Sequence, residues 1–171
     1  MRTPPFDPFE VADRLGIEVS GNYRPEFKDV SGWIEIGRDG EPLIWINPTE
    51  IKVRQRFTLA HELAHLFRDI LPSFDQYRRA GSKKRIEDSD HTLRRDGRAV
   101  PMEFAANRFA GQLLMPKPQI GEYGKKTIAD YKTTHNVDKM PKQQFIADMA
   151  DLFGVSQAAM EVRLKILGVI R

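Results

Sequence analysis

The sequence of 171 residues contains no cysteine. Disulfide bonds, thiolate metal ligands and cysteine nucleophiles are therefore excluded, and any metal site has to use histidine and carboxylate side chains. The sequence also lacks an apolar run approaching the ~20 residues of a membrane-spanning helix, and segment 1–10 lacks the apolar stretch of a secretory signal. These absences predict a soluble cytoplasmic protein without a membrane partner.

Charge of neither sign dominates, since 27 Lys and Arg residues stand against 24 Asp and Glu residues, a net charge of +3. This small excess is typical of a solvated surface and does not require a nucleic-acid partner. Apolar residues make up 40% of the chain and charged residues 30%, which is ordinary globular usage. We expect a monomer or weak oligomer of one domain with a small appendage.

Apolar patterning and turn signals predict a small sheet preceded and followed by helices. A short helix is expected over residues 9–15, ended by Gly16. Two β-prone runs, 33–36 and 43–46, flank a Gly-Arg-Asp-Gly segment that is typical of a hairpin turn. A long buried helix is predicted over residues 48–68, with Asn47 as its N-cap.

The second half of the sequence is predicted to be mainly helical. Residues 78–98 are strongly charged and predict a surface loop. Helices are expected over 102–115, 142–153 and 156–167, with a Gly- and Lys-containing connection before the last two. Together the elements predict an α+β fold: a small antiparallel sheet packed on the 48–68 helix, with a helical C-terminal part. We expect a domain over residues 1–118 and a helical extension over 119–171.

The segment His61-Glu62-Leu63-Ala64-His65 matches the pattern H-E-x-x-H. Residues four apart differ by about 40° around an α-helix, so both imidazoles project from one face and can share one Zn²⁺ ion. Glu62 lies about 100° round from His61. It is therefore predicted to act as the catalytic base that takes a proton from an activated water molecule. The pattern predicts a zinc-dependent peptidase with one ion per chain.

Catalytic zinc usually has three protein ligands, and the third candidate is Glu103. Asn107 follows one helical turn later, where it is placed to accept a hydrogen bond from the outer nitrogen of a ligand histidine. The inner face of this helix is expected to include Phe104 and Phe109. The alternative for Glu103 is a charge that interacts favourably with a helix N-terminus.

The residue that stabilises an oxyanion, or closes over the site, is left open by the sequence. His91 lies in the charged loop and His135 in a later polar segment, and both can equally be solvated histidines. The tyrosines are equally open candidates: Tyr77, Tyr123 and Tyr131.

Segment 145–164 offers a competing function, because a helix, a glycine turn and a serine-capped helix form the outline of a helix-turn-helix. A recognition helix presents Arg, Lys, Asn or Gln to bases, and this one offers Gln157, Arg163 and Lys165, with Glu161 among them. We interpret it as a structural helical pair and expect no direct binding of nucleic acid.

Two long segments resemble the ImmA/IrrE family of zinc metallopeptidases, which are gluzincin-like. Segment 56–65, Arg-Phe-Thr-Leu-Ala-His-Glu-Leu-Ala-His, is similar to that family's R-F-T-L-A-H-E-L-[GA]-H. Segment 103–116 resembles its E-x-E-A-N-x-F-A-x-x-L-L-M-P, although Ala105 replaces the second acidic residue. The loop over 78–98 also looks longer and more basic than is usual in the family.

The resemblance implies a zincin-like fold and an endopeptidase that cleaves a helix-turn-helix transcriptional repressor or antitoxin, relieving repression in a stress response or a mobile element. The ligands implied are His61, His65 and Glu103, with Glu62 as base. The alternative is a toxin–antitoxin component or DNA-binding regulator whose zinc site is not proteolytic.

Overall fold

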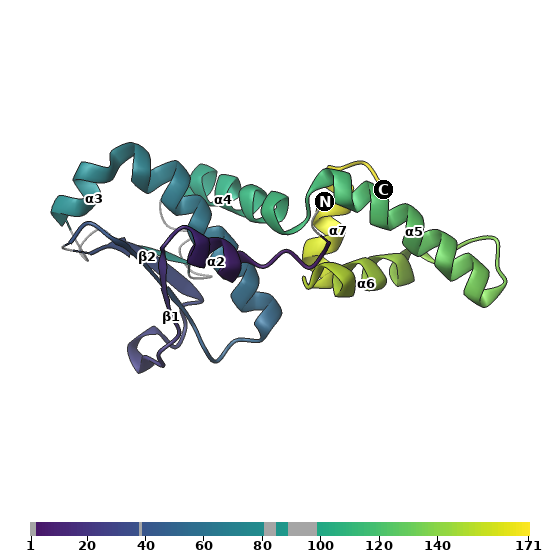
Figure 1. Ribbon diagram of the computed structural model, residues 1–171, viewed down its shortest axis with the longest axis horizontal. Helices are drawn as coiled ribbons and strands as arrows, with labels where there is room; N and C mark the ends of the chain where they lie inside the picture. The colour runs from purple at the N-terminus through teal and green to yellow at the C-terminus, as the bar shows by residue number, and fades with distance from the viewer. Residues whose placement is uncertain (1–2, 38, 81–84, 89–98) are drawn as a thin grey trace. The chain divides into compact units, whose positions relative to one another are not determined.

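The computed structural model describes residues 3–37, 39–80, 85–88 and 99–171. The chain forms two compact units, which are described separately (Figure 1). The sheet unit is Asp7–Ala110, and the helical unit consists of Met1–Phe6 and Gly111–Arg171. The predicted division into domains between residues 118 and 119 stays a prediction.

The sheet unit contains a four-stranded sheet in the order β1-β3-β2-β4. The predicted hairpin is confirmed: β2 (Gly32–Ile36) and β3 (Pro42–Ile46) pair antiparallel, with Trp33 opposite Trp45. Strand β4 (Ile86–Asp88) pairs antiparallel with β2 at the other side.

The predicted α+β fold is confirmed, but the sheet is mixed where a small antiparallel sheet was predicted. Strand β1 (Glu18–Ser20) pairs with β3 and runs parallel to it. The chain passes from β1 through the short helix η1 (Pro25–Phe27) before it enters the hairpin, and β1 lies beside the second hairpin strand rather than the first. A strand of three residues carries too little pattern to indicate this partner.

The two faces of the sheet are covered differently. Helix α2 (Lys52–His65) lies against the face of β2 that carries Gly32 and Ile34. On the opposite face Trp33 and Trp45 stack with ring centroids 6.1 Å apart, and Phe27 of η1 packs against both rings. Both indole side chains are almost completely buried. The sheet therefore has apolar packing on both faces, and α2 packs directly on one of them.

Gly32 is a point of close approach between β2 and α2. A Cβ atom at this position would lie 2.5 Å from Cγ2 of Thr58 and 3.0 Å from the carbonyl oxygen of Trp45. We expect Gly32→Ala to lower the free energy of unfolding by about 1–3 kcal/mol, the usual cost of overpacking a core, in urea unfolding. Gly21→Ala is the control, since a Cβ there meets nothing within 4 Å. Equal stability of the two variants would contradict a tight approach.

Helix α2 begins four residues later than predicted. Asn47 does not cap it: its Oδ1 accepts hydrogen bonds from the amide (3.0 Å) and hydroxyl (2.7 Å) of Thr49, and its Nδ2 donates to the carbonyl of Val30 (3.0 Å). The side chain closes a local turn, and Ile51 becomes the N-cap. Residues 58–65 are all buried, as expected for the central helix.

Helix α2 continues without a break into the π-helical turn η2 (Leu66–Ile70), followed by η3 (Leu71–Ser73) and α3 (Phe74–Ala80). The predicted surface loop over residues 78–98 is therefore wrong where α3 and β4 occupy it. The rest of that segment, 81–84 and 89–98, lies outside the described residues. The predicted short helix near the N-terminus is present as α1 (Pro8–Arg14), capped by Asp7, and Gly16 follows with φ +68°.

Helix α4 (Ala99–Leu114) includes the predicted second helix. The prediction that Phe104 lies on its inner face is wrong. The side chain of Phe104 is 69% exposed, whereas Glu103, Ala106 and Ala110 are buried. Because Phe104 lies about 100° round the helix from Glu103, the two cannot share the buried face.

The helical unit contains α5 (Lys117–His135), α6 (Lys142–Phe153) and α7 (Gln157–Ile166), with α6 packed on both neighbours. Helices α6 and α7 were predicted, and the hydroxyl of Ser156 accepts from the amide of Ala159 as a cap. Helix α5 replaces the predicted connection. Its Gly124 allows the ring of Phe145 to approach closely, so glycine here serves packing rather than a turn. None of the described helices is long and apolar enough to cross a membrane.

Candidate metal centre

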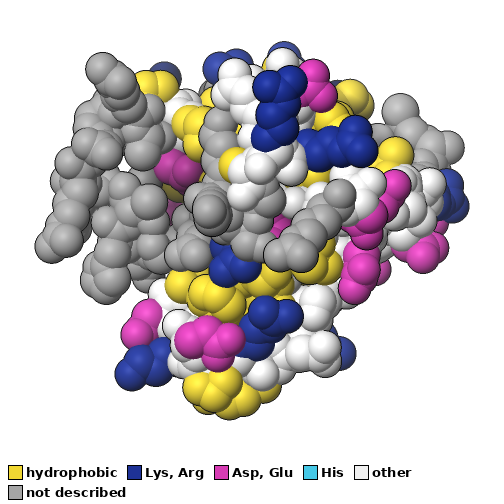
Figure 2. All heavy atoms as spheres, turned by 90° about the vertical axis from the view of Figure 1, so that its left-hand side faces the viewer, with side chains coloured by type: hydrophobic (Ala, Val, Ile, Leu, Met, Phe, Trp, Pro, Cys, Tyr) yellow, Lys and Arg dark blue, Asp and Glu magenta, His cyan; other side chains and the backbone are white. Residues whose placement is uncertain are grey.

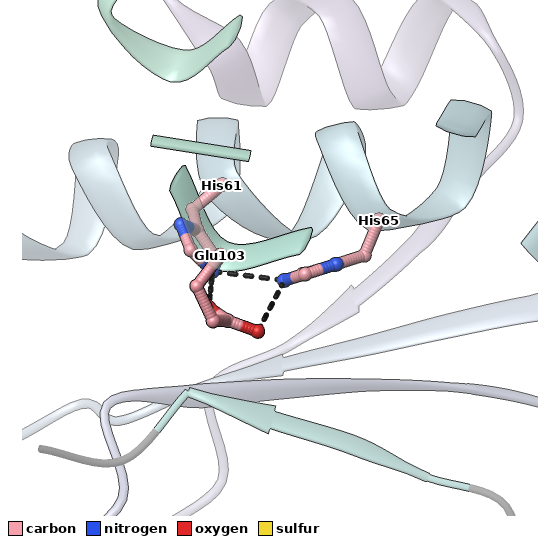
Figure 3. Close-up of side chains that lie close together, drawn as sticks. All are labelled: His61, His65 and Glu103. Carbon is pink, nitrogen blue, oxygen red and sulfur yellow. Dashed lines mark hydrogen bonds and ion pairs between the residues drawn. The ribbon is translucent and has the colours of Figure 1, made fainter. Parts of the chain in front are cut away.

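Three buried side chains of the sheet unit converge on one point (Figure 3). The Nε2 atoms of His61 and His65 lie 2.9 Å apart. The carboxylate of Glu103 approaches both, with Oε2 at 3.0 Å from His61 and Oε1 at 3.4 Å from His65. The two histidines project from α2 and the glutamate from α4. The structure thus brings together the three ligands predicted from sequence.

The outer nitrogens of both imidazoles have acceptors. Nδ1 of His61 lies 3.1 Å from Oδ1 of Asn107, one turn along α4 from Glu103. Nδ1 of His65 lies 2.8 Å from Oδ2 of Asp69, in η2. Asn107 was predicted for this position, and Asp69 was not. The spacing of four residues between His65 and Asp69 is the sequence signal that could have found it.

This arrangement fits a metal ion. Because Asn107 and Asp69 offer oxygen acceptors, each neutral imidazole places its proton on Nδ1 and directs the lone pair of Nε2 inward. Two lone pairs and a carboxylate then face one another at 2.9–3.4 Å. Ligand atoms about 2.0–2.1 Å from a tetrahedral ion are roughly 3.3 Å apart. A cation would turn these unfavourable contacts into coordination, and two nitrogens with one oxygen are a donor set that zinc accepts.

The contacts also determine the charge state of the group. Burial raises the pKa of Glu103, but hydrogen bonds from His61 and His65 outweigh it and lower the pKa from 4.5 to about 2. Burial lowers the pKa of His65, but hydrogen bonds with Glu103 and Asp69 outweigh it and raise the pKa above 6.5. Without metal, the Glu103 carboxylate and the His65 imidazole therefore form a pair in which each favours the charged form of the other.

We expect the metal-free protein to be stabilised by this pair mainly between about pH 4.5 and 6.5. The contribution of Glu103 is present above 4.5 and is lost as the pH falls toward 2, because its pKa is lowered by folding. The contribution of His65 is present below 6.5 and is lost as the pH rises through its raised pKa. Urea unfolding of chelator-treated protein across this range measures the effect. Glu103→Gln should weaken the acid-side dependence, and an unchanged profile would contradict the assignment.

Glu62 is fully buried, with a relative exposure of 0%, and follows His61 on α2. This is the place predicted for a catalytic base. The role itself stays a prediction.

The remaining candidates fall in different places. His91 lies outside the described residues. Tyr77 belongs to the sheet unit, where burial and the carboxylate of Asp69 raise its pKa. Tyr123 and His135 belong to α5 in the helical unit, where Tyr123 packs edge-on against Phe153 and His135 stacks on Tyr131. Their predicted part in the site stays a prediction.

An α+β fold in which α2 supplies two histidines and α4 supplies a glutamate defines a protein with a candidate H-E-x-x-H metal centre. The model of the Peptidase_M78 family, described as the IrrE N-terminal-like domain, matches residues 12–165. The chain belongs to this family, as its sequence segments indicated. Membership supports a function of the protease type or one related to regulation.

The comparison with curated proteins finds no match. Among solved structures, the fold is similar to a Mycobacterium tuberculosis transcriptional regulator, with a TM-score of 0.57 and 20% sequence identity. The match covers 96% of this chain and 42% of that chain. The chain therefore spans less than half the length of that regulator, and the likeness concerns the fold alone.

Proposed function

We propose that this chain is a zinc-dependent endopeptidase that cleaves a helix-turn-helix repressor or antitoxin. The observation that supports this most directly is the fully buried Glu62, which directly follows the ligand candidate His61 on α2. A site that only binds metal needs the three donors, whereas peptide hydrolysis also needs a base within reach of the attacking water.

Each residue has a defined task in this proposal. His61, His65 and Glu103 hold the ion, which when bound lowers the pKa of water and polarises the substrate carbonyl. Glu62 accepts the proton from the attacking water and delivers it to the leaving amine. Its burial favours this role, since a carboxylate shielded from bulk water is a stronger proton acceptor than a solvated one.

The runner-up is a DNA-binding regulator with a non-proteolytic zinc site, and the contacts of two α7 side chains weigh against it. Arg163, a candidate base-reading residue of α7, is buried and its Nε donates to the carbonyl of Met115 at 2.9 Å. Lys165 pairs with Glu161 at 2.8 Å, so the negative charge of α7 offsets one of its cations. In Figure 2, the described acidic and basic side chains on the face in view are intermixed.

A second alternative is a toxin–antitoxin component that binds its partner without cutting it. The presence of Glu62 favours proteolysis over this alternative, because burial of a carboxylate is costly and simple binding has no use for one in the residue that follows a ligand histidine. We therefore propose that the partner protein is a substrate, whether it is a repressor or an antitoxin.

The test is incubation of the zinc-loaded chain with helix-turn-helix regulators of the same genome, beginning with any encoded beside it, with new termini mapped by mass spectrometry. Glu62→Gln is the matched control. A cut made by the wild type and not by the variant supports the proposal. Cleavage of unfolded casein without any regulator would refute the repressor assignment, and no cleavage of either would refute the peptidase.

A further inference from the structure

The two ligand histidines differ in the group behind them. His61 has a neutral amide at 3.1 Å from its Nδ1, whereas His65 has a carboxylate at 2.8 Å. A hydrogen bond to an ionised acceptor is shorter and about twice as strong as one to a neutral acceptor. The metal centre is therefore asymmetric in its outer contacts although its two imidazoles are chemically alike.

The partners also reach the histidines by different routes. Asn107 comes from α4, the helix that carries Glu103, so its position depends on how α4 packs. Asp69 comes from η2, the direct π-helical continuation of α2 beyond His65. Single π-turns inside helices are rare and occur frequently at functional sites. The His65–Asp69 pair is thus built into one continuous helical segment and needs no other element to form.

We propose that Asp69 is a positioning residue for the metal. Its carboxylate keeps the proton of His65 on Nδ1 and leaves Nε2 unprotonated and directed at the ion. Its negative charge makes His65 a stronger donor than His61. Asp69 does not touch the ion in this arrangement, because its oxygen faces the outer nitrogen of the ring. The inference rests on the metal site of the proposed function but not on proteolysis.

The contacts of Asp69 favour this role over a purely structural one. The side chain is only 18% exposed, while that of His65 is 1% exposed, so their contact is largely shielded from water and salt. The next acidic residue, Asp75 in α3, is exposed and provides a matched control.

The experiment compares four full-length proteins: wild type, Asp69→Ala, Asp69→Asn and Asp75→Ala. Zinc affinity is measured by competition with a chelator, and the geometry of the site by the absorption spectrum of the Co²⁺-loaded protein. Urea unfolding of the metal-free proteins reports structural damage separately. No substrate is needed, so failure of this inference and failure of the proposed peptidase activity are distinguishable.

We expect Asp69→Ala to weaken zinc binding about 10–100-fold and to shift the Co²⁺ bands, the usual effect of removing an outer partner of a ligand histidine. Asp69→Asn should retain the band positions and recover part of the affinity, because its amide oxygen still accepts from Nδ1. Asp75→Ala should bind as the wild type does. Wild-type affinity in Asp69→Ala overturns the proposal. The proposal is also overturned if Asp69→Ala binds zinc more weakly, the metal-free variant is destabilised by an equal free energy, and the Co²⁺ bands are unchanged.

Discussion

The variant Glu62→Gln is expected to bind zinc as the wild type does but to cleave peptide bonds at least ~10²–10⁴-fold more slowly, the contribution typical of a general acid–base group. Glutamine has nearly the same shape as glutamate, so the fully buried side chain can be replaced without a cavity. The amide cannot accept the proton of the attacking water. The loss should therefore fall on the rate of the chemical step rather than on metal or substrate binding.

The measurement is the single-turnover rate of cleavage of the substrate identified by mass spectrometry, with zinc content determined by elemental analysis of the same samples. Glu122→Gln, an exposed glutamate of α5, is the control and should cut at the wild-type rate. Wild-type activity in Glu62→Gln would show that another group is the base. Loss of zinc together with activity would show that Glu62 has a structural or ligand role instead.

The second large effect is expected from Glu103→Ala, which removes the only carboxylate of the donor group. Two imidazoles alone leave the ion with too few protein ligands, since catalytic zinc normally has three. We expect an affinity loss greater than the ~10–100-fold that removal of an outer partner costs. The protein purified without chelators should then contain little zinc, and the same holds for His61→Ala.

Arg108→Ala provides the control on the same helix, because Arg108 is exposed on α4 and is not part of the donor group. Equal zinc content in Glu103→Ala and Arg108→Ala would remove Glu103 from the ligand set. Unfolding of the metal-free Glu103→Ala protein should be measured as well, because the variant also removes the contacts of the Glu103 carboxylate with His61 and His65.

The parts of the centre that were predictable from sequence are those determined by local helix geometry. His61 and His65 lie four residues apart, as do Glu103 and Asn107, and each pair occupies one face of its helix. That α2 and α4 lie close enough to join these pairs was inferred only from the chemistry of zinc. Asp69 was not predicted, because the π-turn that carries it is not visible in a hydrophobic pattern.

The wrong predictions about the fold have a common physical cause, which is that one residue type can serve several structural purposes. Asn47 is a good cap, but it closes a turn with Thr49 and bonds to Val30, and the helix begins later. Gly124 suggested a loop, but it makes room for Phe145 within α5. Phe104 was predicted to be a core residue, but the neighbouring Glu103 is buried and Phe104 is exposed. Tertiary partners decide between these uses, and a single sequence does not contain them.

The two stacked indole rings on the sheet provide an intrinsic fluorescence probe of unfolding. Trp33 and Trp45 are the chain's two tryptophans, and both belong to the sheet unit. Tryptophan fluorescence therefore follows the unfolding of that unit alone, whereas far-UV circular dichroism is weighted toward helices and includes α5, α6 and α7. In one urea titration, coincident transitions would mean that the two units unfold cooperatively, and separated transitions that each unfolds independently.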